Sequence, residues 1–211
     1  MALSKMSSDI SFRVLFILAA IAQFAIRVYY QSKVLPEQSK TRITGANWRL
    51  IPGAIASMTT LVFGAAFIFF PSGFPWSYGR FPDWIRWLGA LMLLAGVSLL
   101  AAAHHHLGKS FHSLVVQKSG QVLVDSGPYR LIRHPIYTAY VLSYFGGGLL
   151  ASSLVLTFVP APLYILFIAL RLAEEEAAMI GQFGPSYQDY MDKTGSFLPR
   201  LTALARLRRR S

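Results

Sequence analysis

The feature that most constrains this chain is a series of long apolar runs, of which the one from Leu50 to Phe70 contains no charged residue. A helix that crosses a bilayer needs about 20 consecutive, mostly apolar residues. Charged residues make up 14% of the chain and hydrophobic residues 54%, whereas a soluble domain has about 25% charged residues. The apolar content excludes a disordered chain, and the absence of cysteine excludes a disulfide scaffold. These features predict an integral membrane protein.

We expect about five membrane-spanning helices and therefore an all-α fold. The expected spans are residues 12–30, 50–70, 84–107, 137–152 and 154–172. The last two are short and meet at Ser152–Ser153, which predicts a helical hairpin. We divide the chain into residues 1–83, which hold the first two helices and their loops, and residues 84–211, which hold the other three helices, a loop over 108–137 and the C-terminal tail.

The first of these helices has an alternative interpretation. A basic start, an apolar stretch and the small residues at Ala20–Ala22 are typical of a cleaved signal peptide. The apolar run continues to Tyr30, however, and further spans follow. We therefore expect a retained helix.

Basic residues are distributed unevenly over the connections between the expected spans. The chain has 20 Lys and Arg against 9 Asp and Glu. They are concentrated in residues 31–49, in residues 108–135 and in the tail after Glu174, and five spans place these three stretches on one side. The positive-inside rule makes that side cytoplasmic. We expect the basic tail to contact anionic lipid head groups rather than nucleic acid, because proteins that bind nucleic acid keep a highly charged surface.

Two groups of polar residues border the expected spans. His134 precedes a proline that suits the first turn of a helix, and Tyr129 and Tyr137 flank it. Arg171 and Glu175 are four residues apart, so on a helix they share a face and can pair. Ionisable groups at a membrane boundary indicate a functional site. Two alternatives stay open: a cluster that anchors a helix to head groups, and an arginine that reaches from a helix end to water.

Other motifs predict structure rather than chemistry. The three histidines at 104–106 are consecutive, so they point in different directions around a helix and do not form a metal site. The run Gly146–Gly148 lies inside an apolar span, and Gly147 with Ala151 forms a small-residue pair that predicts close helix packing. No G-x-G-x-x-G, P-loop or H-E-x-x-H motif occurs, so a nucleotide-like cofactor has to bind without a Rossmann fold.

A series of short motifs runs through the second half of the chain, between Leu107 and Leu201. They are Leu114–Gln117, Leu123–Tyr129, Arg133–Tyr137, Arg171 with Glu174–Glu176, and Phe183–Gly184 followed by Tyr187, Tyr190 and Pro199. In this order and spacing they resemble the isoprenylcysteine carboxyl methyltransferase family. The wider superfamily includes phospholipid N-methyltransferases and, more distantly, membrane sterol reductases.

The resemblance implies an integral membrane enzyme that transfers a methyl group from S-adenosyl-L-methionine to a lipid-linked or amphipathic acceptor, at a carboxylate or another oxygen. It implies a cofactor site made of Gln117, Gln121, Val122, Leu123, Val124, Tyr129, His134, Pro135, Ile136 and Tyr137. It also implies that Arg171 and Glu175 are catalytic residues on the acceptor side. Arg171 is then expected to hold an anionic acceptor, and Glu175 to orient Arg171 or to act as a base.

Two other functions are compatible with the same sequence. An NADPH-dependent membrane reductase of the sterol type has a related Arg-His loop, but this chain offers no obvious phosphate clamp beyond Arg130 and Arg133. A non-catalytic lipid-binding membrane protein is expected to bind no cofactor, and it leaves the Arg171–Glu175 pair with a structural role alone.

Overall fold

The structure, a computed structural model, describes residues 2–33, 48–70, 72–108 and 123–200. Helices make up most of this part of the chain, and the only β-bridges in it are two isolated ones, Tyr78 with Ser153 and Ile132 with Gly195. The predicted all-α class is confirmed. Gln117, Gln121 and Val122 of the predicted cofactor site lie outside the described residues, as does most of the basic tail.

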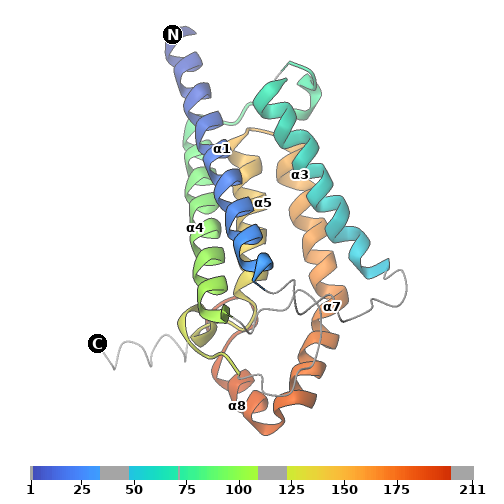
Figure 1. Cartoon of the computed structure of the whole chain (residues 1–211). Helices are drawn as coiled ribbons and strands as arrows, with labels where there is room; N and C mark the ends of the chain where they lie inside the picture. The colour runs from blue at the N-terminus through green and yellow to red at the C-terminus, as the bar shows by residue number, and fades with distance from the viewer. Residues whose placement is uncertain (1, 34–47, 71, 109–122, 201–211) are drawn as a thin grey trace.

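Five long helices form a bundle. They are α1 (Ala2–Ser32), α3 (Ile51–Phe69), α4 (Asp83–Leu107), α5 (Pro135–Leu150) and α7 (Pro160–Phe183). The shorter elements are η1 (Trp48–Leu50), η2 (Pro75–Ser77), η4 (Gly127–Arg130), α6 (Leu154–Phe158) and α8 (Pro185–Lys193). The chain starts at the upper end in Figure 1, alternates in direction from one long helix to the next, and reaches α8 at the lower end.

Four helical segments of the described chain are long and apolar enough to cross a membrane. They are Asp9–Ser32, Trp48–Phe69, Asp83–Leu107 and Leu154–Phe183. The remaining expected span corresponds to α5, whose 16 residues extend over about 24 Å, less than the roughly 30 Å of a bilayer core. α5 and the α6–α7 segment run antiparallel as the expected hairpin (Figure 1). Whether α5 crosses the bilayer completely stays a prediction.

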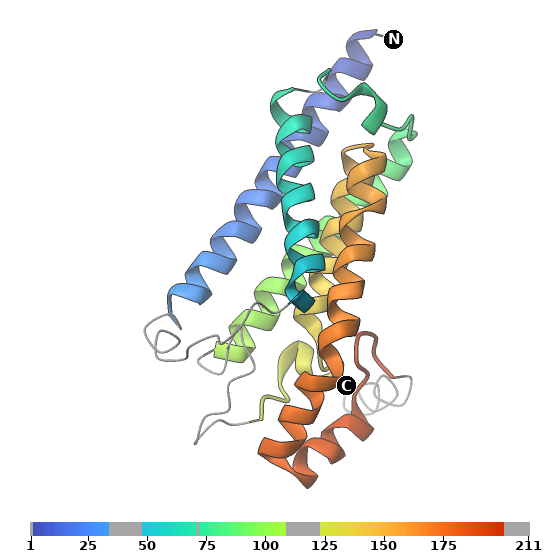
Figure 2. The same ribbon diagram turned by 90° about the vertical axis from the view of Figure 1, so that its right-hand side faces the viewer.

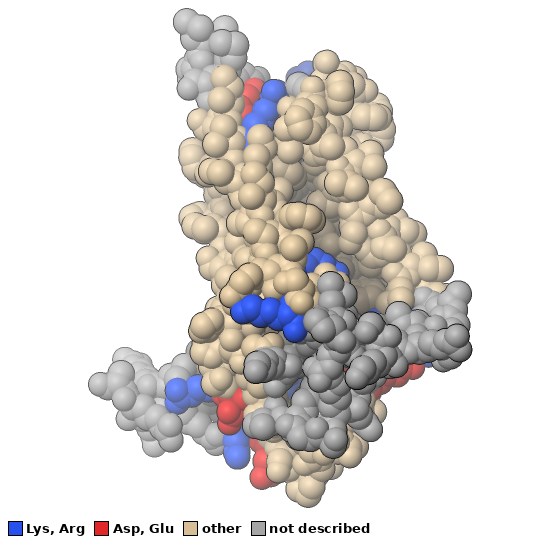
Figure 3. Space-filling view, in the orientation of Figure 1, with Lys and Arg blue, Asp and Glu red and all other residues tan. Residues whose placement is uncertain are grey.

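Charged side chains are scarce over the middle of the bundle. In Figure 3 the central part of the visible face is almost entirely free of Lys, Arg, Asp and Glu, which gather near the upper end and in the lower part. Large apolar side chains such as Leu61, Leu91 and Leu94 are exposed on the helices in between. An exposed apolar belt of this kind requires a lipid environment, so the chain is an integral, multi-pass membrane protein.

Glycines bring α4 and α5 into backbone contact. A Cβ atom added at Gly146 would lie 2.6 Å from the Leu93 nitrogen and 2.8 Å from the Gly89 oxygen. A Cβ atom at Gly96 would lie 2.4 Å from the Ser143 Oγ. The predicted close packing is therefore present, but Gly147 is not its centre: a Cβ atom there meets only the Phe16 ring, at 3.4 Å. The tight contact uses the face of α5 that carries Gly146.

α7 continues well beyond the span expected to end at residue 172. The segment after Arg171 is rich in Ala and Glu, which favour helix, and the helix ends only at Phe183. Gly184 follows with φ 55°, a left-handed conformation that glycine adopts without strain, and the chain turns there into α8. Figure 2 shows α7 continuing down to this turn. The extension carries Glu175 and Glu176 to the level where α5 begins.

Candidate active site

The lower end of the bundle holds a polar cluster that joins the start of α5 to the extension of α7. Pro135 is the first residue of α5, as the sequence predicted, and His134 is the N-cap residue with φ −121° and ψ 59°. The backbone before it is held by the returning chain, because the nitrogens of Arg133 and His134 donate to the Gly195 and Ser196 oxygens at 2.8 and 3.0 Å. The loop and the chain after α8 therefore fold as one unit.

Arg133 joins several segments of this cluster through its hydrogen bonds. Its Nε and Nη2 atoms both lie 3.0 Å from the Glu176 Oε1. Its remaining donors reach the Thr194 oxygen at 2.7 Å and the Ser196 Oγ at 2.7 Å. The Arg133 side chain is 6% exposed. Its partners lie on α7, on α8 and in the chain after α8, so its hydrogen bonds hold these segments to the His134 loop.

His134 lies next to Glu176 and to the aromatic rings of Tyr137 and Phe197. Its Nε2 is 3.3 Å from the Glu176 Oε1, and its ring stacks on Tyr137 with centroids 5.7 Å apart and an interplanar angle of 17°. The Phe197 ring is tilted by 40° against the imidazole, with centroids 5.9 Å apart. Burial lowers the pKa of His134 below its usual value, and this outweighs the opposing effect of Glu176 and Glu175. His134 is therefore neutral at neutral pH.

Tyr137, Glu175 and Arg171 form a continuous chain of hydrogen bonds beside His134. The Tyr137 hydroxyl lies 2.7 and 2.8 Å from the two carboxylate oxygens of Glu175 and shares its one proton between them. The Arg171 Nε and Nη2 atoms each lie 3.2 Å from the Glu175 Oε1, which confirms the predicted pairing. The Arg171 guanidinium also lies over the Phe167 ring, 5.3 Å from its centroid. The Arg171 side chain is 12% exposed, so its charge has little contact with solvent.

The motif made of Phe183–Gly184, Tyr187 and Tyr190 supports the site from α8. The Tyr190 hydroxyl donates to the backbone carbonyl oxygen of Tyr129 at 2.7 Å. Tyr187 and Tyr190 are both buried. Burial, with a smaller effect from Glu176, raises the pKa of Tyr187 to about 12, and burial also raises the pKa values of Tyr129 and Tyr190. All three phenols are neutral and act as packing and hydrogen-bonding groups.

The predicted site residues are only partly brought together. His134, Pro135, Tyr137, Arg171 and Glu175 converge at the junction of α5 and α7. Ile136 is half-buried on the first turn of α5, and Leu123 and Val124 are half-buried in the coil before η4. Tyr129 is 7% exposed and lies against α8 through the Tyr190 bond.

Three residues of the cluster were not among the predicted site residues: Arg133, Glu176 and Phe197. Arg133 and Glu176 were adjacent to predicted members, and their charges were the available signal. Phe197 follows α8 and returns to the His134 ring, and no sequence motif pointed to it. In the described part of the chain, no group of three or more His, Cys, Asp or Glu side chains is arranged to hold a metal ion.

The fold and this cluster together define an all-helical membrane protein with a polar site at one end of its bundle. The sequence profile of the isoprenylcysteine carboxyl methyltransferase family matches residues 87–181, which contain most of α4, all of α5 and α6, and most of α7. Over these residues the chain is similar to the isoprenylcysteine carboxyl methyltransferase family.

Curated relatives each match a little over half of the chain. The protein-S-isoprenylcysteine O-methyltransferase of Schizosaccharomyces pombe is 32% identical over 53% of this chain and 48% of its own length. The cobalt-zinc-cadmium resistance protein CzcN of Cupriavidus metallidurans is 31% identical over 55% of this chain and 53% of its own. Methanethiol S-methyltransferase 2 of Bradyrhizobium diazoefficiens is 29% identical over 58% and 47%. The chain thus spans about half the length of these relatives.

The fold is also similar to a solved structure. The eukaryotic intramembrane Ras methyltransferase ICMT superposes with a TM-score of 0.56, covering 88% of this chain and 63% of the other, at 20% sequence identity. A similarity at this level of identity concerns the fold alone.

Proposed function

We propose that this chain is a membrane methyltransferase that uses S-adenosyl-L-methionine and acts on a lipid-linked or amphipathic acceptor at the lower end of the bundle. The observation that carries the proposal is the Tyr137–Glu175–Arg171 chain of hydrogen bonds beside a neutral His134. Its members come from two family motifs that lie 38 positions apart in the sequence, as measured between Tyr137 and Glu175.

The chemistry of the described residues fits this cofactor. When bound, S-adenosyl-L-methionine supplies a methyl group on a cationic sulfonium. Aromatic faces attract a cation of this kind, and Tyr137 and Phe197 are aromatic rings next to His134. A neutral imidazole adds no repulsive charge, and the two arginines of the cluster are balanced by Glu175 and Glu176. We propose His134, Pro135, Ile136, Tyr137, Leu123 and Val124 as the described part of the cofactor site.

On the acceptor side, we propose that Arg171 binds an anionic or strongly polar oxygen. A guanidinium stays charged at all physiological pH values and suits a carboxylate. The Tyr137 hydroxyl shares its one proton between the two oxygens of Glu175, and one of these oxygens is also paired with Arg171. This occupancy favours Glu175 as the residue that positions Arg171 and Tyr137, rather than as a base. A carboxylate acceptor needs no base, and alignment in a dry site can then supply much of the rate.

Two of the relatives are named for methylating a protein-linked isoprenylcysteine and a small thiol, methanethiol. We propose an amphipathic acceptor because Arg171 and Glu175 lie on a helical segment that is long and apolar enough to cross a membrane.

The first test is calorimetric titration of the purified chain in mild detergent with S-adenosyl-L-methionine, its demethylated product and NADPH. We expect the first two to bind and NADPH not to. His134→Ala is expected to weaken cofactor binding at least tenfold, because it removes the ring that packs against Tyr137 and Phe197. Arg171→Ala is expected to keep cofactor affinity and to lose turnover of the acceptor.

Matched controls separate these effects from general damage. His105→Ala removes an exposed histidine from the end of α4, and Arg200→Ala removes an exposed arginine after α8. Both are expected to retain wild-type binding and turnover. Wild-type turnover in His134→Ala and Arg171→Ala contradicts the proposal, and NADPH binding without S-adenosyl-L-methionine binding favours a reductase instead.

A further inference from the structure

Glu176 contacts His134 through a single carboxylate oxygen. The Glu176 Oε1 lies 3.3 Å from the His134 Nε2, and the same oxygen lies 3.0 Å from both the Nε and the Nη2 of Arg133. A guanidinium has only N–H donors, so this oxygen accepts from Arg133 and carries no proton of its own. The hydrogen bond to the imidazole therefore runs in one direction: the His134 Nε2 carries the hydrogen and donates it to Glu176.

This contact determines the tautomer of the His134 ring. His134 is neutral at neutral pH, because burial lowers its pKa. A neutral imidazole has one N–H group, and its other nitrogen is a hydrogen-bond acceptor. With the hydrogen on Nε2, the Nδ1 atom has a lone pair available for a donor.

The protein supplies no donor to this lone pair among the described residues. The ring contacts of His134 in that part of the chain are those with Glu176, Tyr137 and Phe197, and none of them involves a hydrogen bond to Nδ1. Nδ1 is also not one of the side-chain nitrogens and oxygens that are both buried and unpaired there. The His134 side chain is 12% exposed. Nδ1 is therefore open to a donor that comes from a ligand.

The position of the ring does not depend on Glu176 alone. The imidazole stacks on Tyr137 at an interplanar angle of 17°, and the Phe197 ring packs against it. The His134 backbone nitrogen donates to the Ser196 oxygen at 3.0 Å. A change at Glu176 that removes its acceptor oxygen therefore leaves the ring in place and changes which nitrogen carries the hydrogen.

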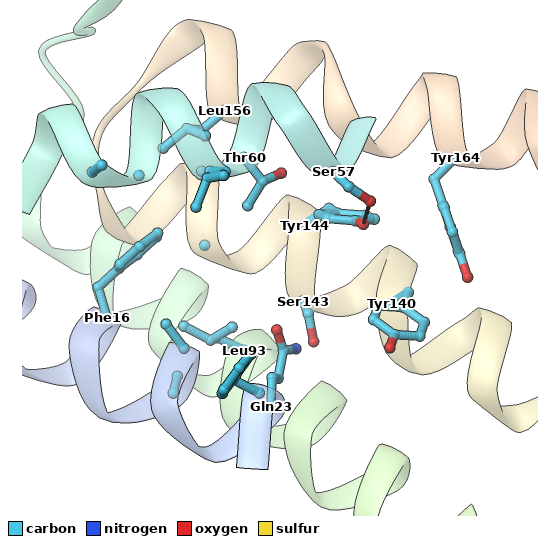
Figure 4. Close-up of a pocket in the computed structure, with 18 of the residues that line it drawn as sticks. Phe16, Gln23, Ser57, Thr60, Leu93, Tyr140, Ser143, Tyr144, Leu156 and Tyr164 are labelled. Atoms are coloured by element: carbon cyan, nitrogen blue, oxygen red, sulfur yellow. Dashed lines mark hydrogen bonds between the residues drawn. The ribbon is translucent and has the colours of Figure 1, made fainter. Parts of the chain in front are cut away.

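Further contacts fix α5, which His134 caps, against the helices around it. The ring centroids of Tyr140 and Tyr144 lie 5.4 and 5.3 Å from that of Tyr164 on α7. Figure 4 shows the side chains of Tyr144 and of Ser57 on α3 pointing toward each other, and their hydroxyl oxygens are 3.4 Å apart. The placement of α5 relative to α7 is thus set by packing well away from Glu176.

We propose that Glu176 is a positioning residue: it holds His134 in the Nε2–H tautomer, so that Nδ1 accepts a hydrogen bond from an N–H or O–H group of the bound cofactor. This inference rests on the proposed function for the identity of the ligand, and S-adenosyl-L-methionine has amino and hydroxyl groups that donate. The opposite tautomer presents a second donor to those groups and leaves them without an acceptor, which weakens binding. Glu176 acts on the cofactor only through His134.

The tautomer can be measured without any cofactor. Nuclear magnetic resonance of the full chain in detergent, at about pH 8, correlates the ring nitrogens with the carbon-bound ring protons. The signal that is missing in His134→Ala identifies the ring. We expect the Nε2–H tautomer alone in the wild type and a mixture of both tautomers in Glu176→Met, which has no acceptor oxygen. Glu176→Gln is expected to keep the Nε2–H tautomer, because its amide oxygen can accept from Arg133 and His134.

Calorimetric titration with S-adenosyl-L-methionine gives the second readout. Glu176→Met is expected to weaken binding about tenfold, the effect of one hydrogen bond, and Glu176→Gln is expected to stay within about threefold of the wild type. Glu174→Met is the matched control: it removes a neighbouring carboxylate of α7 that pairs with Arg49 instead, and both the tautomer and the affinity are expected to be unchanged.

Substitutions of His134 itself keep the inference testable should Glu176→Met fail to fold. The side-chain amide of asparagine lies near the position of Nδ1, and that of glutamine lies near the position of Nε2. We therefore expect His134→Asn to bind the cofactor more tightly than His134→Gln. The reverse order contradicts an acceptor role for Nδ1.

Other outcomes also decide the question. The Nδ1–H tautomer in the wild type overturns the inference, and so does an unmixed Nε2–H tautomer in folded Glu176→Met. Equal losses of affinity in Glu176→Gln and Glu176→Met assign Glu176 a structural role alone and overturn it as well. A wild type that binds no S-adenosyl-L-methionine overturns the proposed function, and with it the ligand of Nδ1. That failure is distinguishable, because the tautomer is measured on the chain alone.

Discussion

At the residue scale, the candidate site depends on how four charged side chains are paired. The i, i+4 spacing of Arg171 and Glu175 made one pair predictable, because a helix brings these positions together whatever surrounds it. The second pair, Arg133 with Glu176, joins a loop to a helix and has no such local rule. Glu176 contacts both Arg133 and His134, so it couples the two halves of the cluster.

The buried imidazole of His134 has a consequence for stability. Its pKa is lowered in the folded chain relative to the ordinary value of 6.5, so below about pH 6.5 the unfolded chain takes up the proton first. The stabilising contribution of His134 is therefore complete above that pH and is lost as the pH falls through it. We expect the difference in thermal unfolding midpoint between wild type and His134→Gln to shrink between about pH 8 and pH 5. His105→Gln, at an exposed position, serves as the control, and a difference that stays constant with pH contradicts the expectation.

At the element scale, the contact between α4 and α5 sets the position of the site. Gly89 and Gly146 allow the two backbones to touch, and this fixes the height at which α5 begins with His134 and Pro135. Small residues have this role in membrane proteins because dispersion contacts, rather than the hydrophobic effect, hold helices together in lipid.

Two adjacent glycines of α5 provide a direct test of this packing. We expect Gly146→Ala to lower the free energy of unfolding by about 1–3 kcal/mol, because its Cβ atom overlaps the backbone of α4. Gly147→Ala is expected to be neutral or slightly stabilising, since its Cβ atom finds ordinary contact distance and alanine favours helix by about 1 kcal/mol. Thermal unfolding of both variants in detergent is the measurement, and equal losses contradict the assigned contact.

At the scale of the whole molecule, Lys and Arg residues are distributed unevenly between the two ends of the bundle. The lower end carries Lys33, Arg49, Arg130, Arg133 and Lys193 among the described residues. We propose that this end, and with it the candidate active site, faces the cytoplasm, as the positive-inside rule indicates.

The absence of cysteine from the chain makes this orientation straightforward to test. Ser72 lies at the upper end and Ser186 on α8 at the lower end, and both are exposed. In intact cells we expect a membrane-impermeant maleimide to label Ser72→Cys and to spare Ser186→Cys, with both labelled after lysis. The reverse pattern places the site on the other side of the membrane.

Much of this architecture was determined by the sequence alone. The helices, their order, the hairpin and the Arg171–Glu175 pair follow from hydrophobic runs and local spacing, and these depend only on neighbours along the chain. The family motifs likewise identified His134 and Tyr137, which lie at the start of one helix.

Only the tertiary structure decided which distant groups meet. The extension of α7 brings Glu175 onto the Tyr137 hydroxyl, Phe197 returns to the His134 ring, and Gly146 rather than Gly147 faces α4. These contacts join residues far apart in the chain and depend on the rotation and depth of each helix, which packing sets and local sequence does not.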